Sequence, residues 1–179
     1  IRALQSAKEQ GMYLPVVYNT GGYERVETLI MLDGLVDIYL PDFKYLNTDH
    51  AKKYSMAEDY PEIAKAALAE MVIDERGMMK RGVIVRHLLL PGCLADGKRV
   101  VKYLHETYGN RIYMSLMSQY TPLESLDAVK YPELNRKVPE YAYEKLVDYA
   151  ISLGVMQAFI QEGDTAKESF IPPFTLEGV

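Results

Sequence analysis

The sequence contains no tryptophan and a single cysteine, Cys93, among its 179 residues. One cysteine excludes an internal disulfide framework, and it excludes a metal centre built from several thiolates of this chain. Such cysteine usage is typical of a reducing compartment, so we expect a cytoplasmic protein. The large amphipathic side chains are instead the 15 tyrosines, whose pattern does not define a cofactor site.

Basic charge and long apolar runs are also scarce. Lysine and arginine number 20 against 25 acidic residues, which leaves a net charge of -5. Nucleic acids and anionic membranes both favour a basic surface, so we expect neither as a partner. No apolar run approaches the roughly 18 residues of a membrane-spanning helix, and no signal peptide is recognisable. The hydrophobic fraction of 49% is that of an ordinary globular protein of one domain.

Helical and extended patterns alternate along the chain. Apolar residues at helical spacing predict helices over residues 1–10, 24–32, 59–72, 96–108 and 139–153, and Thr48 could cap a further short one. Short apolar runs between them predict strands over residues 14–18, 35–40, 82–92, 112–117 and 155–160. Strands separated by helices require crossover connections, so the sequence predicts an α/β fold with a parallel sheet.

Residues 82–92, GVIVRHLLLPG, are apolar on both faces and predict a strand covered on both sides. Arg86 and His87 nevertheless lie in its middle, and they point to opposite faces because side chains alternate along a strand. An unpaired buried guanidinium costs several kcal/mol. Arg86 therefore needs either a ligand carboxylate or a structural partner such as Asp37, and the pattern leaves both open.

Polar residues follow the expected strands at their carboxyl ends, which is the edge where parallel α/β folds bind ligands. Asp42 and Lys44 are two residues apart and would share a face, either around a ligand or as a surface ion pair. The turn at residues 19–22 could cradle a ligand but matches no phosphate-binding motif. These strand-end candidates are Asn19, Asp42, Lys44, Arg86, Gln119 and Tyr120.

The histidines and the cysteine offer weaker candidates. His87, opposite to Arg86, is expected to be a core histidine bonded to the backbone, and His50 and His105 to lie on helix surfaces. Their spacing is a poor match to a metal site. Cys93 has no evident base nearby and is expected to be a spectator.

Six segments together resemble the radical S-adenosylmethionine (SAM) proteins related to pyruvate formate-lyase activating enzyme, in particular the PflX-like branch. The resemblance covers nearly the whole chain and implies a partial (β/α) barrel over residues 1–162, truncated at its amino terminus, with about four to five parallel strands. Residues 163–179 would form a tail that packs on this domain. The segments are VVYNTGGYE, VDIYLPDFKY, KKYSMAEDYPEIAKAALAEM, GVIVRHLLLPG, IYMSLMSQYTP and SFIPPFTLEGV.

The same resemblance implies roles for single residues at a SAM site across the carboxyl ends of the strands. Asp42 and Lys44 match a D-x-K block near the ribose and carboxylate of SAM, and Arg86 matches the arginine of an R-[YH]-x-x-x-P-G strand on the SAM side. Asn19 lies in a block similar to a strand-end T-N-G segment. Gln119 or Tyr120 occupies the place of a ligand-facing histidine in such proteins.

The Cys-x-x-x-Cys-x-x-Cys loop and the Gly-Gly-Glu block of such proteins do not occur in this sequence. We therefore expect no catalytic and no metal-ligating residue here, and an inactive chain that is part of a longer protein carrying the [4Fe-4S] cluster. That longer protein would cleave SAM to a 5'-deoxyadenosyl radical and act on a protein or peptide, for example a glycyl radical enzyme. An exposed sheet edge would offer a route to dimerisation.

Two other functions remain open at this point. A phosphate-dependent or metal-dependent hydrolase on a small parallel α/β domain would need a site at Asp42, Lys44 and His87. A non-catalytic α/β binding scaffold would need no such site.

Overall fold

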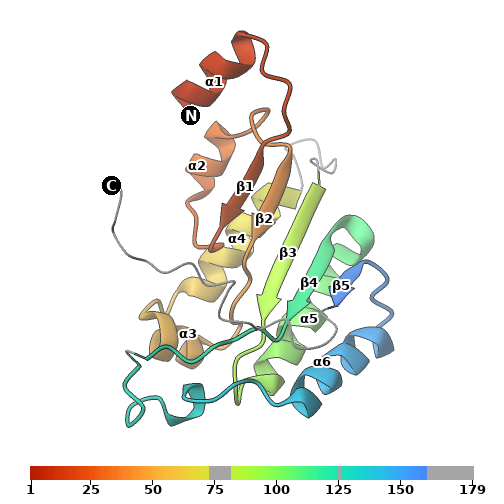
Figure 1. Cartoon of the computed structure of the whole chain (residues 1–179). Coiled ribbons are helices and arrows are strands. Elements are labelled where there is room, and N and C mark those ends of the chain that lie inside the picture. Colours follow the sequence, from red (N-terminus) through yellow and green to blue (C-terminus); the bar gives the residue numbers. More distant parts are fainter. Residues whose placement is uncertain (73–81, 125, 161–179) are drawn as a thin grey trace.

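A computed structural model describes residues 1–72, 82–124 and 126–160 (Figure 1). The tail predicted over residues 163–179 lies outside the described residues, as do residues 161 and 162 of the predicted barrel. The helices and strands are α1 (Arg2–Glu9), β1 (Val17–Thr20), α2 (Val26–Met31), β2 (Ile38–Pro41), α3 (Thr48–Ser55), α4 (Tyr60–Val72), β3 (Gly82–Leu88), α5 (Leu94–Tyr108), β4 (Tyr113–Met117), α6 (Glu140–Ser152) and β5 (Ala158–Ile160).

The five strands form one all-parallel sheet in the order β1-β2-β3-β4-β5. The predicted α/β fold with about five parallel strands is confirmed. Because each strand lies beside the next one in the chain and crossovers are right-handed, the connecting helices lie on the same side of the sheet (Figure 1). This is the winding of a (β/α) barrel, in which the other face of the sheet would point to the barrel interior.

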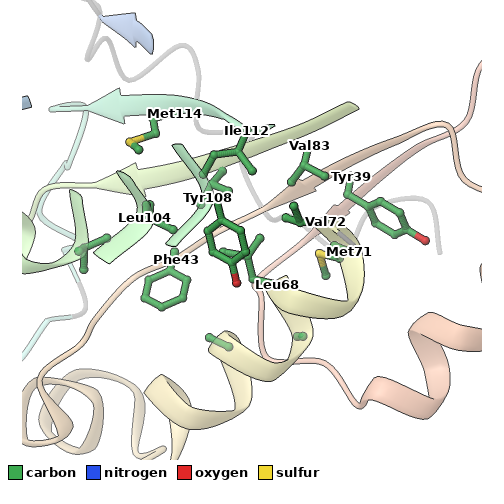
Figure 2. Close-up of a cluster of buried hydrophobic side chains, with 14 of the residues drawn as sticks. Tyr39, Phe43, Leu68, Met71, Val72, Val83, Leu104, Tyr108, Ile112 and Met114 are labelled. Atoms are coloured by element: carbon green, nitrogen blue, oxygen red, sulfur yellow. The ribbon is translucent and has the colours of Figure 1, made fainter. Parts of the chain in front are cut away.

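The hydrophobic core lies between the sheet and its helices. Figure 2 shows side chains of β2, β3 and β4 facing those of α4 and α5. Val83 and Val85 of β3 are at most 1% exposed. The described elements share a single cluster, whose largest members include Leu29, Tyr39, Phe43, Leu68, Met71, Leu104, Ile112, Met114, Leu116 and Leu146.

The second face of the sheet is only half buried. Along β3, Val83, Val85 and His87 are buried, whereas Ile84, Arg86 and Leu88 on the other side are partly exposed. The prediction that residues 82–92 are covered on both faces is therefore wrong for the described part of the chain. The reason lies in the strand order, because a singly wound sheet receives its helices on one face only.

Two local predictions also need correction. Strand β1 covers Val17–Thr20 instead of residues 14–18, because pairing begins where Val17 meets Ile38 of β2, and Asn19 thereby lies inside the strand. Asp96 does not precede its helix but lies buried in the first turn of α5. Its carboxylate accepts bonds from the backbone N–H groups of residues 46 and 47 at 3.3 and 3.2 Å, so it joins α5 to the chain before α3.

Candidate functional site

Three neighbouring strands bring the predicted polar residues together at the carboxyl edge of the sheet. Asn19 lies next to the last residue of β1, and Asp42 directly follows β2. Asp42 also pairs with Arg86 of β3 as an isolated parallel bridge. The sheet register therefore extends one step past β2, and Asp42 and Arg86 share the half-buried face.

The Arg86 guanidinium is bound on two sides. Its Nε donates to Asp42 Oδ1 at 2.8 Å, and one terminal nitrogen lies 2.6 Å from the same oxygen. The same terminal nitrogen donates to Asn19 Oδ1 at 2.8 Å. About a quarter of each side chain of the Arg86–Asp42 pair is exposed. The guanidinium thus has a fixed orientation and one rim open to a ligand.

Asp37 is not the partner of Arg86. Its carboxylate accepts a hydrogen bond from the Val16 N–H at 2.9 Å and lies 3.7 Å from Lys8 Nζ. Asp37 directly precedes β2, at the opposite end of the sheet from Arg86's partner Asp42. The interpretation of Arg86 as half of a pair with Asp37 is therefore wrong, and the structural partner is Asp42.

A cavity of about 350 Å³ opens beside this ion pair. That volume lies near the lower end of the range of small-molecule sites. Five of the six strand-end candidates line it, and the sixth, Asn19, does not line it but bonds to Arg86. The lining residues are Asp42, Lys44, Tyr45, Arg86, Leu88, Leu90, Met117, Gln119 and Tyr120.

The cavity has a net positive charge and an apolar wall. Asp42 and Arg86 compensate each other, whereas the Lys44 ammonium has no ion pair or hydrogen bond with any described residue. Leu88, Leu90 and Met117 supply the apolar surface. This combination suits a ligand that joins an anionic group to an apolar or aromatic body.

Gln119 and Tyr120 contribute differently. The Tyr120 hydroxyl donates to the Leu134 carbonyl at 2.8 Å, and burial raises the pKa of this phenol. The Gln119 amide lies 3.5 Å from the Met117 sulfur, a weak contact. Tyr120 is therefore anchored to the loop that follows β4, and both residues line the cavity.

The apolar side chains of the cavity were not predicted from the sequence. Leu88 and Leu90 follow Arg86 at intervals of two, so the alternation of side chains along a strand was a sufficient signal for them. Tyr45 and Met117 had no comparable signal, because their place at the cavity depends on a loop path and on the pairing of β3 with β4.

The histidines lie away from the cavity. His87 is 3% exposed on the helix side of β3, and its Nδ1 lies 2.9 Å from the Phe43 carbonyl oxygen, which confirms a core histidine bonded to the backbone. Burial lowers the pKa of His87. His50 and His105 are on helices as predicted but are half buried, and His50 Nδ1 lies 3.4 Å from Asp96.

Neither the cysteine nor any acidic cluster forms a metal centre in the described ranges. Cys93 is 7% exposed at the start of α5, and burial raises the pKa of its thiol to about 11. Residues 1–72, 82–124 and 126–160 contain no group of three or more His, Cys, Asp or Glu side chains that could bind a metal ion. A [4Fe-4S] cluster requires several thiolates, so the residues of this chain do not fit one.

The described residues form a singly wound parallel α/β domain with a cavity at the carboxyl edge of its strands, lined by Asp42, Lys44 and Arg86 among others. No family model of known proteins matches the sequence. The chain is 31% identical over 138 residues to the uncharacterized protein MJ0674 of Methanocaldococcus jannaschii. The match covers 76% of this chain but 38% of the length of that relative.

In the part of the chain that the structure describes, no helix combines the length and the apolar character needed to cross a bilayer.

Proposed function

We propose that this chain binds S-adenosylmethionine in the cavity at the carboxyl edge of β2 and β3, as part of a longer radical SAM protein related to pyruvate formate-lyase activating enzyme. The observation that carries the proposal is that Asp42, Lys44 and Arg86 line one cavity. SAM carries a carboxylate, ribose hydroxyls and an adenine ring, which correspond to a cationic, hydrogen-bonding and partly apolar site.

The three polar groups have distinct tasks in this proposal. The Lys44 ammonium, which is unpaired among the described residues, attracts the ligand carboxylate. The Asp42 carboxylate accepts hydrogen bonds from ribose hydroxyls while it also binds Arg86. Arg86 donates from its open rim, and Asn19 keeps the guanidinium in place.

The radical chemistry would belong to the cofactor and to an iron-sulfur cluster, which this chain does not supply. Bound SAM would supply a 5'-deoxyadenosyl radical for hydrogen abstraction from a protein or peptide substrate, such as a glycyl radical enzyme. The residues of this chain bind and orient the molecule and restrict water on the Leu88, Leu90 and Met117 side. The chain alone is expected to be inactive and the longer protein to be cytoplasmic.

The half-exposed sheet face and the terminal strands β1 and β5 suggest how the isolated chain would behave. Val17 and Phe159 are 52% and 53% exposed on these edge strands. Unpaired strand edges with apolar side chains promote association. We therefore expect the isolated chain to form dimers at high concentration, which sedimentation velocity would detect.

Titration calorimetry with SAM on the isolated chain tests the proposal. We expect measurable binding that weakens about tenfold or more in Lys44→Gln, because the attraction for the carboxylate is lost. The matched control is Lys102→Gln, which removes an exposed lysine of α5 that does not line the cavity. The control is expected to bind SAM like the unmodified chain.

Two outcomes would contradict the proposal. If SAM does not bind, or if both lysine variants bind it equally, the cavity is not a SAM site. Binding of inorganic phosphate in place of SAM, with the same dependence on Lys44, would favour the hydrolase. That alternative also needs His87 at the site, and His87 lies on the opposite face of β3.

The catalytic part of the proposal needs the longer protein. Anaerobic reconstitution with iron and sulfide is expected to produce the broad visible absorption of an iron-sulfur cluster and reductive cleavage of SAM. Absence of both would contradict the radical SAM assignment, whatever the isolated chain binds.

A further inference from the structure

The phenol of Tyr60 lies between the two loops that follow β1 and β2. Tyr60 is the first residue of α4 and is 3% exposed. Its hydroxyl lies 3.1 Å from the Gly21 carbonyl oxygen and 3.1 Å from the Asp42 carbonyl oxygen, and it accepts a hydrogen bond from the Lys44 N–H at 3.0 Å. One side chain from a helix thus bonds to the backbone of both strand-end loops.

These two loops are in direct backbone contact. Gly22 has a φ of +77°, and a Cβ added there would lie 2.1 Å from the Asp42 carbonyl oxygen. A side chain at this position would push the loops apart. The close approach leaves the Tyr60 hydroxyl within reach of both loops at once.

The Tyr60 ring is held in place by its neighbours. It stacks on Tyr23 with ring centroids 5.9 Å apart, and it meets Tyr45 edge to face at 5.6 Å. Burial raises the pKa of Tyr60, so the phenol keeps its proton and can donate. The position of its oxygen is therefore set by packing as well as by hydrogen bonds.

The chain leaves the sheet at this point. The N–H of Asp42 still donates to Thr20 and that of Phe43 to Arg86, at 2.9 and 2.8 Å. The next N–H, that of Lys44, donates to Tyr60 instead of to a strand. The Tyr60 hydroxyl thus accepts the next backbone hydrogen bond after the last strand pairing, at a residue that lines the cavity.

We propose that Tyr60 is a positioning residue of the cavity, whose hydroxyl sets the place of residues 42–44 relative to Arg86. It touches no cavity ligand itself, since it is absent from the lining residues. It acts through the backbone of Asp42 and Lys44. The inference rests on the proposed function in so far as the cavity is a binding site.

The first test needs no ligand. Tyr60→Phe removes one oxygen and keeps the stacked ring, so the fold is expected to persist. Hydrogen exchange followed by NMR should then be faster at the Lys44 amide and at the Arg86 Nε–H, whose partner Asp42 lies in the released segment. Tyr143→Phe is the matched control, because its buried hydroxyl also donates to a backbone carbonyl, that of Leu116, at 2.8 Å.

A purely structural role would lower stability in both phenylalanine variants without a selective effect at the site. The inference is therefore overturned if Arg86 Nε–H exchange changes equally in the two variants or in neither. Thermal melting of both proteins shows whether they are folded and how far their stabilities match.

The second test uses SAM as the probe. We expect Tyr60→Phe to bind SAM about tenfold more weakly than Tyr143→Phe does. A tenfold change in affinity is of the size expected for the loss of roughly one hydrogen bond. Equal affinities would overturn the inference. If the unmodified chain does not bind SAM, the proposed function fails, and the exchange experiment alone decides the role of Tyr60.

Discussion

Arg86 and His87 are neighbours in β3 whose side chains have opposite environments. The Arg86 Nε bonds to Asp42 Oδ1 at 2.8 Å beside the cavity, whereas His87 Nδ1 lies 2.9 Å from the Phe43 carbonyl oxygen on the helix side. Their partners, residues 42 and 43, are themselves neighbours. Arg86 and His87 thus lie on opposite faces of the sheet, so substitution of each one tests the contacts of a different face.

The Asp42–Arg86 pair is expected to couple in a double-mutant cycle. Asp42→Asn and Arg86→Gln should each destabilise the chain, and we expect a coupling free energy of about 1 kcal/mol, since the pair is partly shielded from water. Urea unfolding of the four proteins measures it. The control cycle is Lys102→Gln with Glu106→Gln, an exposed helical pair at 3.7 Å, which should couple by less than about 0.5 kcal/mol. Equal coupling in both cycles would contradict the prediction.

Stability is expected to fall in acid because of His87. Burial lowers its folded-state pKa below the ordinary value of 6.5, so the unfolded chain takes up a proton at a higher pH than the native chain does. The stabilisation is complete above about pH 6.5 and is lost as the pH falls through that value toward the lower folded-state pKa. The free energy of unfolding in urea between pH 7.5 and 5 measures this slope.

His87→Leu removes the titrating group and is expected to flatten that pH dependence by up to about 1.4 kcal/mol per pH unit, even though it also loses the bond to Phe43. An unchanged slope in this variant would show that other groups cause the acid sensitivity.

Gly22→Ala is expected to be strongly destabilising. Its φ of +77° is unfavourable for alanine, and the added Cβ would lie 2.1 Å from a backbone oxygen. Gly34→Ala is the control, with a φ of +73° and no atom within 4 Å of the added Cβ. We expect a loss of about 1–2 kcal/mol at Gly34 from backbone conformation alone, and at least about 2 kcal/mol more at Gly22 from the clash. Similar losses in urea unfolding would mean that the two loops separate freely.

Cys93 is expected to be unreactive in the native chain. A thiol with a pKa of about 11 in place of 9.0 carries roughly 100-fold less thiolate at neutral pH, and the side chain is also buried. Alkylation by iodoacetamide at pH 7.5, followed by mass spectrometry, should be slow without urea and fast above the unfolding transition. Rapid native alkylation would contradict the buried placement.

The alternation of helical and extended patterns was enough to predict a parallel α/β sheet and the opposite directions of Arg86 and His87, because both follow from local periodicity. The clustering of Asp42, Lys44 and Arg86 was also predictable, since parallel strands place their carboxyl ends at one edge. Strand limits were less accurate. Asn19 was expected in a turn but lies in β1, because the strand begins where a partner strand is available for pairing.

Local sequence could therefore establish which residue types lie at the carboxyl edge and on which side of a strand each one points. It could not establish that Arg86 binds Asp42 instead of Asp37, since both acids lie close to β2 and only the register between β2 and β3 distinguishes them. The role of Tyr60 is a stronger case of the same kind. Tyr60 lies 16 residues after Lys44 at the start of a helix, and its hydroxyl contacts two loops. Such contacts arise from three-dimensional packing, which the periodicity of the sequence does not encode.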